Sequence, residues 1–217
     1  MPPCPSRPQR RLPLSRDRIV DAAIELVERH GPAALSMRRL GAQLGVEGMA
    51  LYHYLAGREE LLRAIADRLL APLRRVQPTD DWREYCRRFA RALRTIGKSR
   101  PSTFLLVGLQ PFDTPGALQP VERLLEALVA AGFAAQEALA VYRAVASYAR
   151  GYALAEATGF TVDAANAAGR ERLRALDARA FPILGGRADQ LARLDPDTAY
   201  ELGLRALLDG LRDPTRA

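Results

Sequence analysis

The 217-residue chain is poor in the residue types that most often build metal and redox sites. It has two cysteines, Cys4 and Cys86, and two histidines, His30 and His53, at spacings unlike those of metal-binding motifs. Such cysteine usage gives no disulfide framework and is typical of the reducing cytoplasm, where we expect the protein to reside. We expect no metal site and no cofactor.

Long apolar runs and phosphate-binding loops are missing as well. No stretch of about 18 apolar residues occurs, so no membrane-spanning helix is predicted. The basic N-terminus is not followed by the apolar segment of a signal peptide. The glycines of "GAQLG" fall within a predicted helix and turn, and not behind a strand, so they do not indicate a nucleotide-binding loop. Without a reactive constellation, the chain is not expected to be an enzyme.

Lysine is almost absent, and the arginines that replace it are unevenly spread. The net charge is +7, and residues 1–75 hold 13 arginines against 8 acidic residues, whereas the other 142 residues hold 19 basic and 17 acidic groups. Codon bias accounts for arginine in place of lysine but not for the excess at the front. That excess is what a polyanion-binding module requires.

Hydrophobic periodicity predicts helices along the chain and no credible strand, so we expect an all-α fold. Residues 1–14, which contain five prolines, are expected to form a disordered basic arm. Ser15 and Ser36 are predicted N-caps of the first two helices, with a stop at Gly31. A third helix is expected from about Gly48 to Tyr54, and a longer fourth one should end or kink at Pro72. Residues 159–193 read as a weakly patterned connection.

The second and third helices, with a glycine turn between them, predict a helix-turn-helix within residues 15–60. Leu51 and Leu55 point to the core, which turns Gly48, Met49, Tyr52 and His53 outward. In the major groove of DNA, Gly48 would allow close approach, and Met49 and Ala50 would touch thymine methyls. His53 would reach a base or a phosphate, and Tyr52 and Tyr54 would donate to phosphates. Aromatic residues at helical spacing are, however, more often core residues than ligand contacts.

The stretch "RIVDAAIELVERHGPAALSMRRLGAQLGVEGMALYHYLAGREELLRAIADRLL" resembles the DNA-binding region of the TetR family of bacterial transcriptional regulators. The resemblance adds Arg38 and Arg58 as expected phosphate or base contacts. It implies a homodimeric repressor that binds a palindromic operator and is released by a small molecule. The alternative left open is a DNA-binding regulator or activator that responds to no ligand.

By the same resemblance, residues 61–217 form a helical ligand-binding and dimerisation domain. The helix at 136–158 is either a central core helix or, with the helix at 195–212, half of a four-helix dimer interface. Arg74, Phe89 and Leu106 stand where the tetracycline repressor has polar and metal-binding groups, so a more apolar effector is expected. Residues expected to line its cavity are Phe89, Leu93, Phe104, Leu106, Gln110, Tyr142 and Tyr148.

Overall fold

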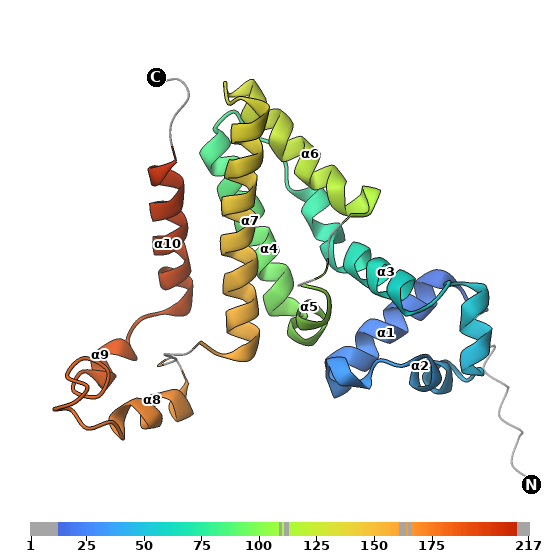
Figure 1. The fold of residues 1–217 in the computed structure, drawn as a ribbon, viewed down its shortest axis with the longest axis horizontal. Coiled ribbons are helices and arrows are strands. Elements are labelled where there is room, and N and C mark those ends of the chain that lie inside the picture. The colour runs from blue at the N-terminus through green and yellow to red at the C-terminus, as the bar shows by residue number, and fades with distance from the viewer. Residues whose placement is uncertain (1–12, 109, 111–112, 161–163, 165, 212–217) are drawn as a thin grey trace, which may run out of the picture. The chain divides into compact units, whose positions relative to one another are not determined.

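The computed structural model describes residues 13–108, 110, 113–160, 164 and 166–211, and Figure 1 shows its helices in chain order. Within these residues all regular structure is helical, which confirms the expected all-α fold. No helix in this part of the chain is long and apolar enough to cross a membrane. Most of the expected N-terminal arm, with Cys4, lies outside the described residues.

The chain divides into two compact units, one ending at Ile65 and the other beginning at Ala66. The boundary falls inside a continuous helix, α3, and the sequence had placed it at residue 60. The elements of the first unit are α1 (Arg16–His30), the 3-10 helix η1 (Pro32–Ala34), α2 (Met37–Leu44), the 3-10 helix η2 (Gly48–His53) and the first part of α3 (Arg58–Leu70).

Local signals determine where the helices of the first unit begin and end. The Ser15 hydroxyl accepts from the backbone N–H of Arg18, and the Ser36 hydroxyl accepts from that of Arg39, as expected of N-caps. Gly31 follows α1 with a φ of 80°, and Gly45 follows α2 in the left-handed conformation. The third helix differs from expectation, because its six residues form a 3-10 helix and not an α-helix.

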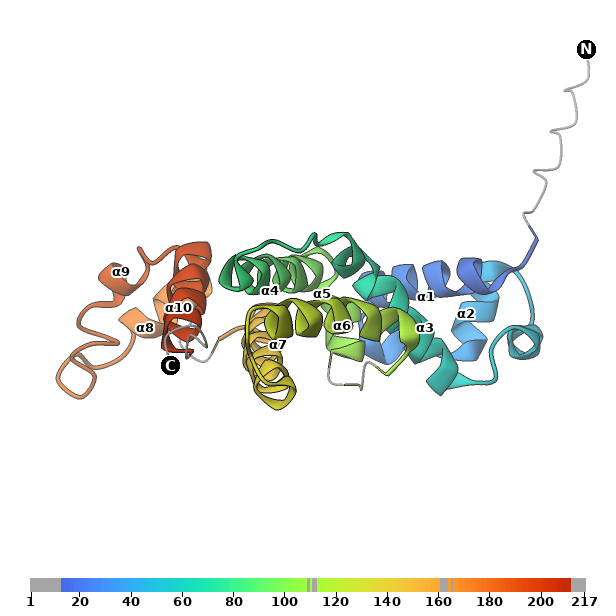
Figure 2. The same cartoon turned by 90° about the horizontal axis from the view of Figure 1, so that it is seen from above.

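The second unit is a bundle arranged around α4 and α7, which lie side by side in Figures 1 and 2. It contains the end of α3, the 3-10 helix η3 (Ala71–Arg75), α4 (Trp82–Ser99), α5 (Pro101–Val107), α6 (Pro115–Ala130), α7 (Ala135–Thr158), α8 (Ala167–Arg174), α9 (Ala188–Leu191) and α10 (Pro196–Gly210). The α-helical part of α3 ends before Pro72, as predicted. The apolar stripe of α4 is buried, and the ring of Trp82 packs edge-on against Phe133 at 4.9 Å.

The segment between α7 and α10 is more regular than the sequence indicated. Residues 159–193 were expected to be a weakly patterned connection, but they contain α8 and α9. These helices enclose a small core of Ala164, Leu173 and Ala188, against which Leu176 and Leu184 pack. The expectation was wrong because both helices are short, so neither spans enough residues to show a clear apolar stripe.

Candidate nucleic-acid interface

The turn between α2 and η2 brings two backbones into direct contact. Leu40, Leu51 and Leu55 are fully enclosed, so η2 is anchored by its apolar side onto the rest of the first unit. Gly41 lies where α2 meets η2: a Cβ atom there would be 2.8 Å from the backbone nitrogen of Gly48 and 2.9 Å from the carbonyl oxygen of Val46. Any residue larger than glycine at position 41 would force this turn apart.

Gly48 has a packing role that the sequence did not reveal. A Cβ at this position would come within 3.1 Å of the Met37 carbonyl oxygen and 3.3 Å of the Arg38 Cα. Both distances are tight for a side-chain carbon. The absence of a side chain at Gly48 therefore lets η2 approach α2, whatever it also does at an outer surface.

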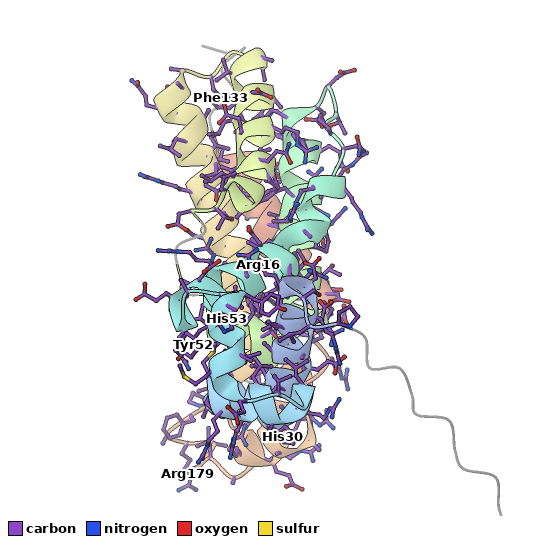
Figure 3. All side chains as sticks on the ribbon, turned by 90° about the vertical axis from the view of Figure 1, so that its right-hand side faces the viewer. Arg16, His30, Tyr52, His53, Phe133 and Arg179 are labelled. Carbon is purple, nitrogen blue, oxygen red and sulfur yellow. The ribbon has the colours of Figure 1, made fainter. Side chains whose placement is uncertain are left out.

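The side of η2 opposite Leu51 is uncovered, and its large side chains are Met49, Tyr52, His53 and Tyr54, hereafter the η2 face. Met49 is 71% exposed, Tyr52 47% and Tyr54 41%, and His53 is also exposed. Tyr52 and His53 are labelled among the side chains of Figure 3. Ala50, at the margin, is half-buried. Four large side chains within six residues are thus held outward by buried leucines.

The two arginines expected near the η2 face are placed differently. Arg38, in the first turn of α2, is exposed. Arg58, the first residue of α3, is also exposed, but its Nη1 donates a hydrogen bond of 2.8 Å to the carbonyl oxygen of Leu35. Arg58 therefore ties α3 to the segment between η1 and α2, and it has a structural role besides any contact with an anion.

Glu60 fixes the start of α3. Its carboxylate accepts a 2.6 Å hydrogen bond from the backbone N–H of Ala56 and pairs with Arg16 at 3.2 Å. The hydrogen bond from Ala56, with the smaller contribution of Arg16, holds the pKa of Glu60 below its ordinary value. The first turns of α1 and α3 are thereby joined beside the η2 face.

The basic excess of the front of the chain does not lie in the described residues of the first unit. Residues 13–65 contain seven arginines and seven acidic residues: Arg16, Arg18, Arg29, Arg38, Arg39, Arg58 and Arg63, against Asp17, Asp21, Glu25, Glu28, Glu47, Glu59 and Glu60. The surplus comes from the arginines at positions 7, 10 and 11 and from those after residue 65. Attraction to a polyanion in this unit thus depends on where single arginines lie.

The residues expected to contact an effector lie in the second unit, but they do not share one environment. Phe89, Leu93 and Phe104 are enclosed in the core, Leu106, Tyr142 and Tyr148 are half-buried, and Gln110 is exposed. The rings of Phe89 and Tyr142 meet edge-on at 6.1 Å. The Tyr148 hydroxyl donates to the carbonyl oxygen of Tyr200 at 2.8 Å, and so it holds α7 against α10.

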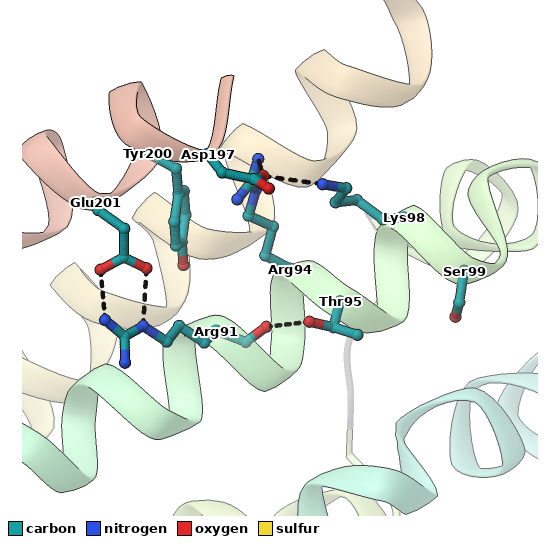
Figure 4. A pocket seen from close by; sticks show the side chains of 8 residues that line it. All are labelled: Arg91, Arg94, Thr95, Lys98, Ser99, Asp197, Tyr200 and Glu201. Atoms are coloured by element: carbon teal, nitrogen blue, oxygen red, sulfur yellow. Dashed lines mark hydrogen bonds and ion pairs between the residues drawn. The ribbon is translucent and has the colours of Figure 1, made fainter. Parts of the chain in front are cut away.

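A polar cavity between α4 and α10 was missed by the sequence analysis. Its walls carry alternating charges: Arg91, Arg94 and Lys98 on α4 face Asp197 and Glu201 on α10 (Figure 4). None of the expected effector contacts lines it. The spacing of the basic residues on one face of α4 and of the acids on one face of α10 was a weak available signal. Among the described residues, no cluster of histidine, cysteine and carboxylate side chains could hold a metal ion.

Family models match the chain in two parts. Residues 19–65 match the model described as bacterial regulatory proteins of the tetR family, and residues 76–214 match the tetracycline repressor-like C-terminal domain.

Two curated relatives match nearly the whole chain. A helix-turn-helix transcriptional regulator of Saccharopolyspora erythraea is 32% identical, covering 95% of this chain and 91% of the relative. The class A tetracycline repressor of Escherichia coli is 29% identical, with 91% of this chain and 90% of the repressor covered.

Among solved structures, apo ActR from Streptomyces coelicolor superposes with a TM-score of 0.77 at 27% identity, covering 94% of this chain and 98% of ActR. ActR in complex with actinorhodin gives a TM-score of 0.75 at the same identity, covering 92% and 97%.

Proposed function

Because the chain belongs to the TetR family of bacterial regulatory proteins, we propose that it binds a palindromic operator as a homodimer and leaves it when a small effector binds. The protein is a ligand-responsive, DNA-binding transcriptional repressor and not an enzyme. The observation that supports this proposal is the exposure of the η2 face, through which we expect the protein to contact DNA. We also infer that the protein acts in the cytoplasm, where its operator would be.

The chemistry of the η2 face suits the major groove of DNA. Met49 is an exposed apolar side chain that a thymine methyl group would cover, and His53 can bond to a base edge or a phosphate. The hydroxyls of Tyr52 and Tyr54 can donate to phosphate oxygens, which position the protein without reading sequence. The small side chain of Ala50 would let the backbone come close to the bases, whereas the space that Gly48 leaves is occupied by the backbone of α2.

Of Arg38 and Arg58, Arg38 is the more available for contact with a phosphate, since it is exposed at the first turn of α2. Arg58 is a weaker candidate for a purely electrostatic role, because its guanidinium already donates to Leu35. We propose that both contact phosphates, and that Arg58 does so with its remaining donors.

A palindromic operator needs two copies of the η2 face about 34–36 Å apart, in successive turns of the major groove. We propose that α7 and α10 supply the dimer interface. They contact each other within the second unit, and apolar side chains remain exposed on them, among them Leu139 on α7 and Leu202 on α10. A four-helix interface with a second copy would cover these side chains.

Release of DNA requires a link between the effector and α3. The helix α3 continues unbroken across the boundary between the units. In the second unit, the hydroxyl of Thr114, which is the N-cap of α6, forms a short hydrogen bond with the carboxylate of Asp67 on α3. An effector that displaces α6 would therefore pull on α3, and coupling of roughly 1–3 kcal/mol would weaken operator binding about 5- to 150-fold.

We propose that the effector is small and mainly apolar and that it contacts Phe89, Leu93, Phe104, Leu106, Gln110, Tyr142 and Tyr148. The relatives support an effector that is a small molecule, since one is named a tetracycline repressor and another was crystallised with actinorhodin. The enclosure of Phe89, Leu93 and Phe104 favours one alternative, a regulator that takes no ligand. A ligand-dependent rise in melting temperature and loss of operator binding would exclude that alternative.

The proposal is tested by separating positioning residues from reading residues. Binding sites are selected from random DNA, and affinities are measured by fluorescence anisotropy at several salt concentrations. Arg38→Ala should weaken binding to all sequences by a similar factor and reduce the salt dependence by about one unit of slope. Met49→Ala and His53→Ala should instead change the preferred base, by about 1–3 kcal/mol at the contacted position.

The matched control is Arg172→Ala on α8, which removes the same charge from an exposed position outside the first unit. It should leave affinity and salt dependence unchanged. An equal loss of affinity on every sequence from Arg38→Ala, Met49→Ala and His53→Ala would contradict the division of roles. Failure to select any sequence would contradict the operator itself.

A further inference from the structure

The cavity between α4 and α10 has the size of a small-molecule site, with a volume of about 540 Å³. Its charged walls are held by forked ion pairs. Arg91 Nε and Nη2 each donate to the Glu201 carboxylate at 2.7 Å, and Arg94 makes the same kind of fork with Glu156, at 2.9 and 2.5 Å. Both forks are of the bidentate type by which arginine recognises carboxylates.

One carboxylate in the cavity is bound less firmly than these two. Arg94 and Lys98 both approach the same oxygen of Asp197, Oδ1, at 2.8 and 2.9 Å. The Asp197 side chain is 64% exposed and sits in the first turn of α10, whereas Arg94 beneath it is 8% exposed. Asp197 therefore occupies a place between two cations that is open to solvent on its outer side.

The wall of the cavity also contains a buried hydroxyl group that lacks a partner. The Tyr200 ring lies beside Arg94, whose guanidinium carbon is 4.4 Å from the ring centroid, and near the Arg91–Glu201 pair (Figure 4). Its hydroxyl is buried and has no hydrogen-bond partner in the described structure. A buried hydroxyl without a partner is unfavourable, and burial raises the pKa of Tyr200, so the group remains a donor.

We propose that this cavity is a binding site for a small organic monocarboxylate, whose anionic group displaces the Asp197 carboxylate from between Arg94 and Lys98. The remainder of the molecule would lie toward Tyr200, where an acceptor would satisfy the hydroxyl. Glu156, Glu201 and the displaced Asp197 remain nearby, and their repulsion disfavours a doubly charged anion such as phosphate. The site is separate from the expected apolar effector contacts, and its occupation can be measured without DNA.

The test is calorimetric titration of the full-length protein, without DNA, with benzoate as the probe. Benzamide serves as the neutral molecule of the same shape, and phosphate as the multiply charged anion. Benzoate should bind in a saturable manner, and both comparison compounds should bind at least about tenfold more weakly, because a hydrogen bond to a charged group contributes about 1.5–3 kcal/mol. Equal binding of benzoate and benzamide, or preference for phosphate, would overturn the proposal.

Two substitutions should move the affinity in opposite directions. Lys98→Met removes one of the two cations and should weaken benzoate binding about tenfold. Its control, Arg179→Met, removes the same charge from an exposed loop and should have no effect. Asp197→Asn removes the competing carboxylate and should tighten binding, whereas Asp209→Asn, also exposed on α10, should not.

Both test side chains are largely exposed, so the variants should fold, and a thermal melt of each checks this. Unchanged benzoate affinity in both Lys98→Met and Asp197→Asn would refute the site. A protein that binds benzoate as predicted but selects no operator would support this site and refute the proposed function, so the two outcomes can be told apart.

Discussion

Replacing Arg94 by methionine tests how firmly α4 is held to α7 and α10 in the second unit. The side chain of Arg94 is 8% exposed, forks the carboxylate of Glu156 and contacts Asp197. Methionine keeps much of the apolar stem but leaves Glu156, which is 16% exposed, without its counter-ion. Removing one partner of a buried ion pair costs about 3–5 kcal/mol, and we expect a loss of unfolding free energy in this range.

Arg91→Met is the matched comparison on the same helix. Arg91 forks Glu201 with equally good geometry, but the two side chains are 48% and 33% exposed. Exposed pairs contribute about 0–1 kcal/mol, so this variant should lose little stability. The two ion pairs differ chiefly in how deeply they are buried, and the expected difference in stability between the variants follows from that burial.

Urea unfolding followed by tryptophan fluorescence measures both variants. Trp82 is the only tryptophan and is buried at the start of α4, so its signal reports the second unit. All measurements use one protein concentration, because a dimer would make stability concentration-dependent. The double variant Arg94→Met with Glu156→Leu should recover most of the loss. Equal losses from Arg94→Met and Arg91→Met, or no recovery in the double variant, would refute the argument.

Two further outcomes are expected. The pKa of Asp197 is lowered by Lys98 and Arg94, and that of Glu201 is lowered by Arg91. The contribution of these ion pairs to folding stability is therefore complete above the ordinary carboxyl pKa of about 4, and it disappears as the pH falls through the lower pKa values of the folded state. The melting temperature should therefore fall as the pH is lowered from about 5, and it should fall less in Asp197→Asn than in the wild type. Identical curves of melting temperature against pH would exclude a stabilising interaction of Asp197 with Lys98 and Arg94. Gly41→Ala should lower the stability of the first unit, because overpacking against the backbone costs about 1–3 kcal/mol and more than offsets the smaller gain in helix propensity; a higher melting temperature by circular dichroism would contradict this.

The ends of the helices in the first unit were predictable because their signals are local. Ser15 and Ser36 cap the helices that follow them, and Gly31 adopts the positive φ that its position after the first helix suggested. The 3-10 form of η2 was not predictable, because six residues are too few to distinguish a period of three from one of 3.6. The contact of Gly41 with Gly48 was also invisible, since it depends on how α2 and η2 meet in space.

The exposed character of the η2 face followed from the position of Leu51 and Leu55, and the structure places Met49, Tyr52 and His53 on the surface as expected. Their roles toward DNA remain predictions. In the second unit, α8 and α9 were missed because helices of eight and four residues are too short to show a clear helical period. The hydrogen bond of Arg58 to Leu35 was missed because any arginine at a helix start looks available in sequence alone.

The charged network that joins α4 to α7 and α10 lay beyond sequence reasoning because its partners are far apart along the chain. Glu156 is 62 positions from Arg94, and Glu201 is 110 positions from Arg91. An arginine on the polar side of an amphipathic helix is normally assigned to solvent, whereas Arg94 is buried against Glu156 of α7 and Tyr200 of α10.

Charged side chains are usually exposed and large apolar or aromatic ones are usually buried, but Arg94 is buried and the η2 face is exposed. Each of these arrangements requires a partner. A buried guanidinium is tolerated only with counter-charges, and Arg94 has them within its own chain, from Glu156 and Asp197. Met49, Tyr52 and Tyr54 form an exposed cluster of large side chains, which the described residues leave uncovered. Folding thus supplies the partners of the buried Arg94, whereas only binding to another molecule would cover the exposed η2 face. For that reason the η2 face is the stronger indicator of an external partner, and losses of affinity from Met49→Ala should appear without losses of stability.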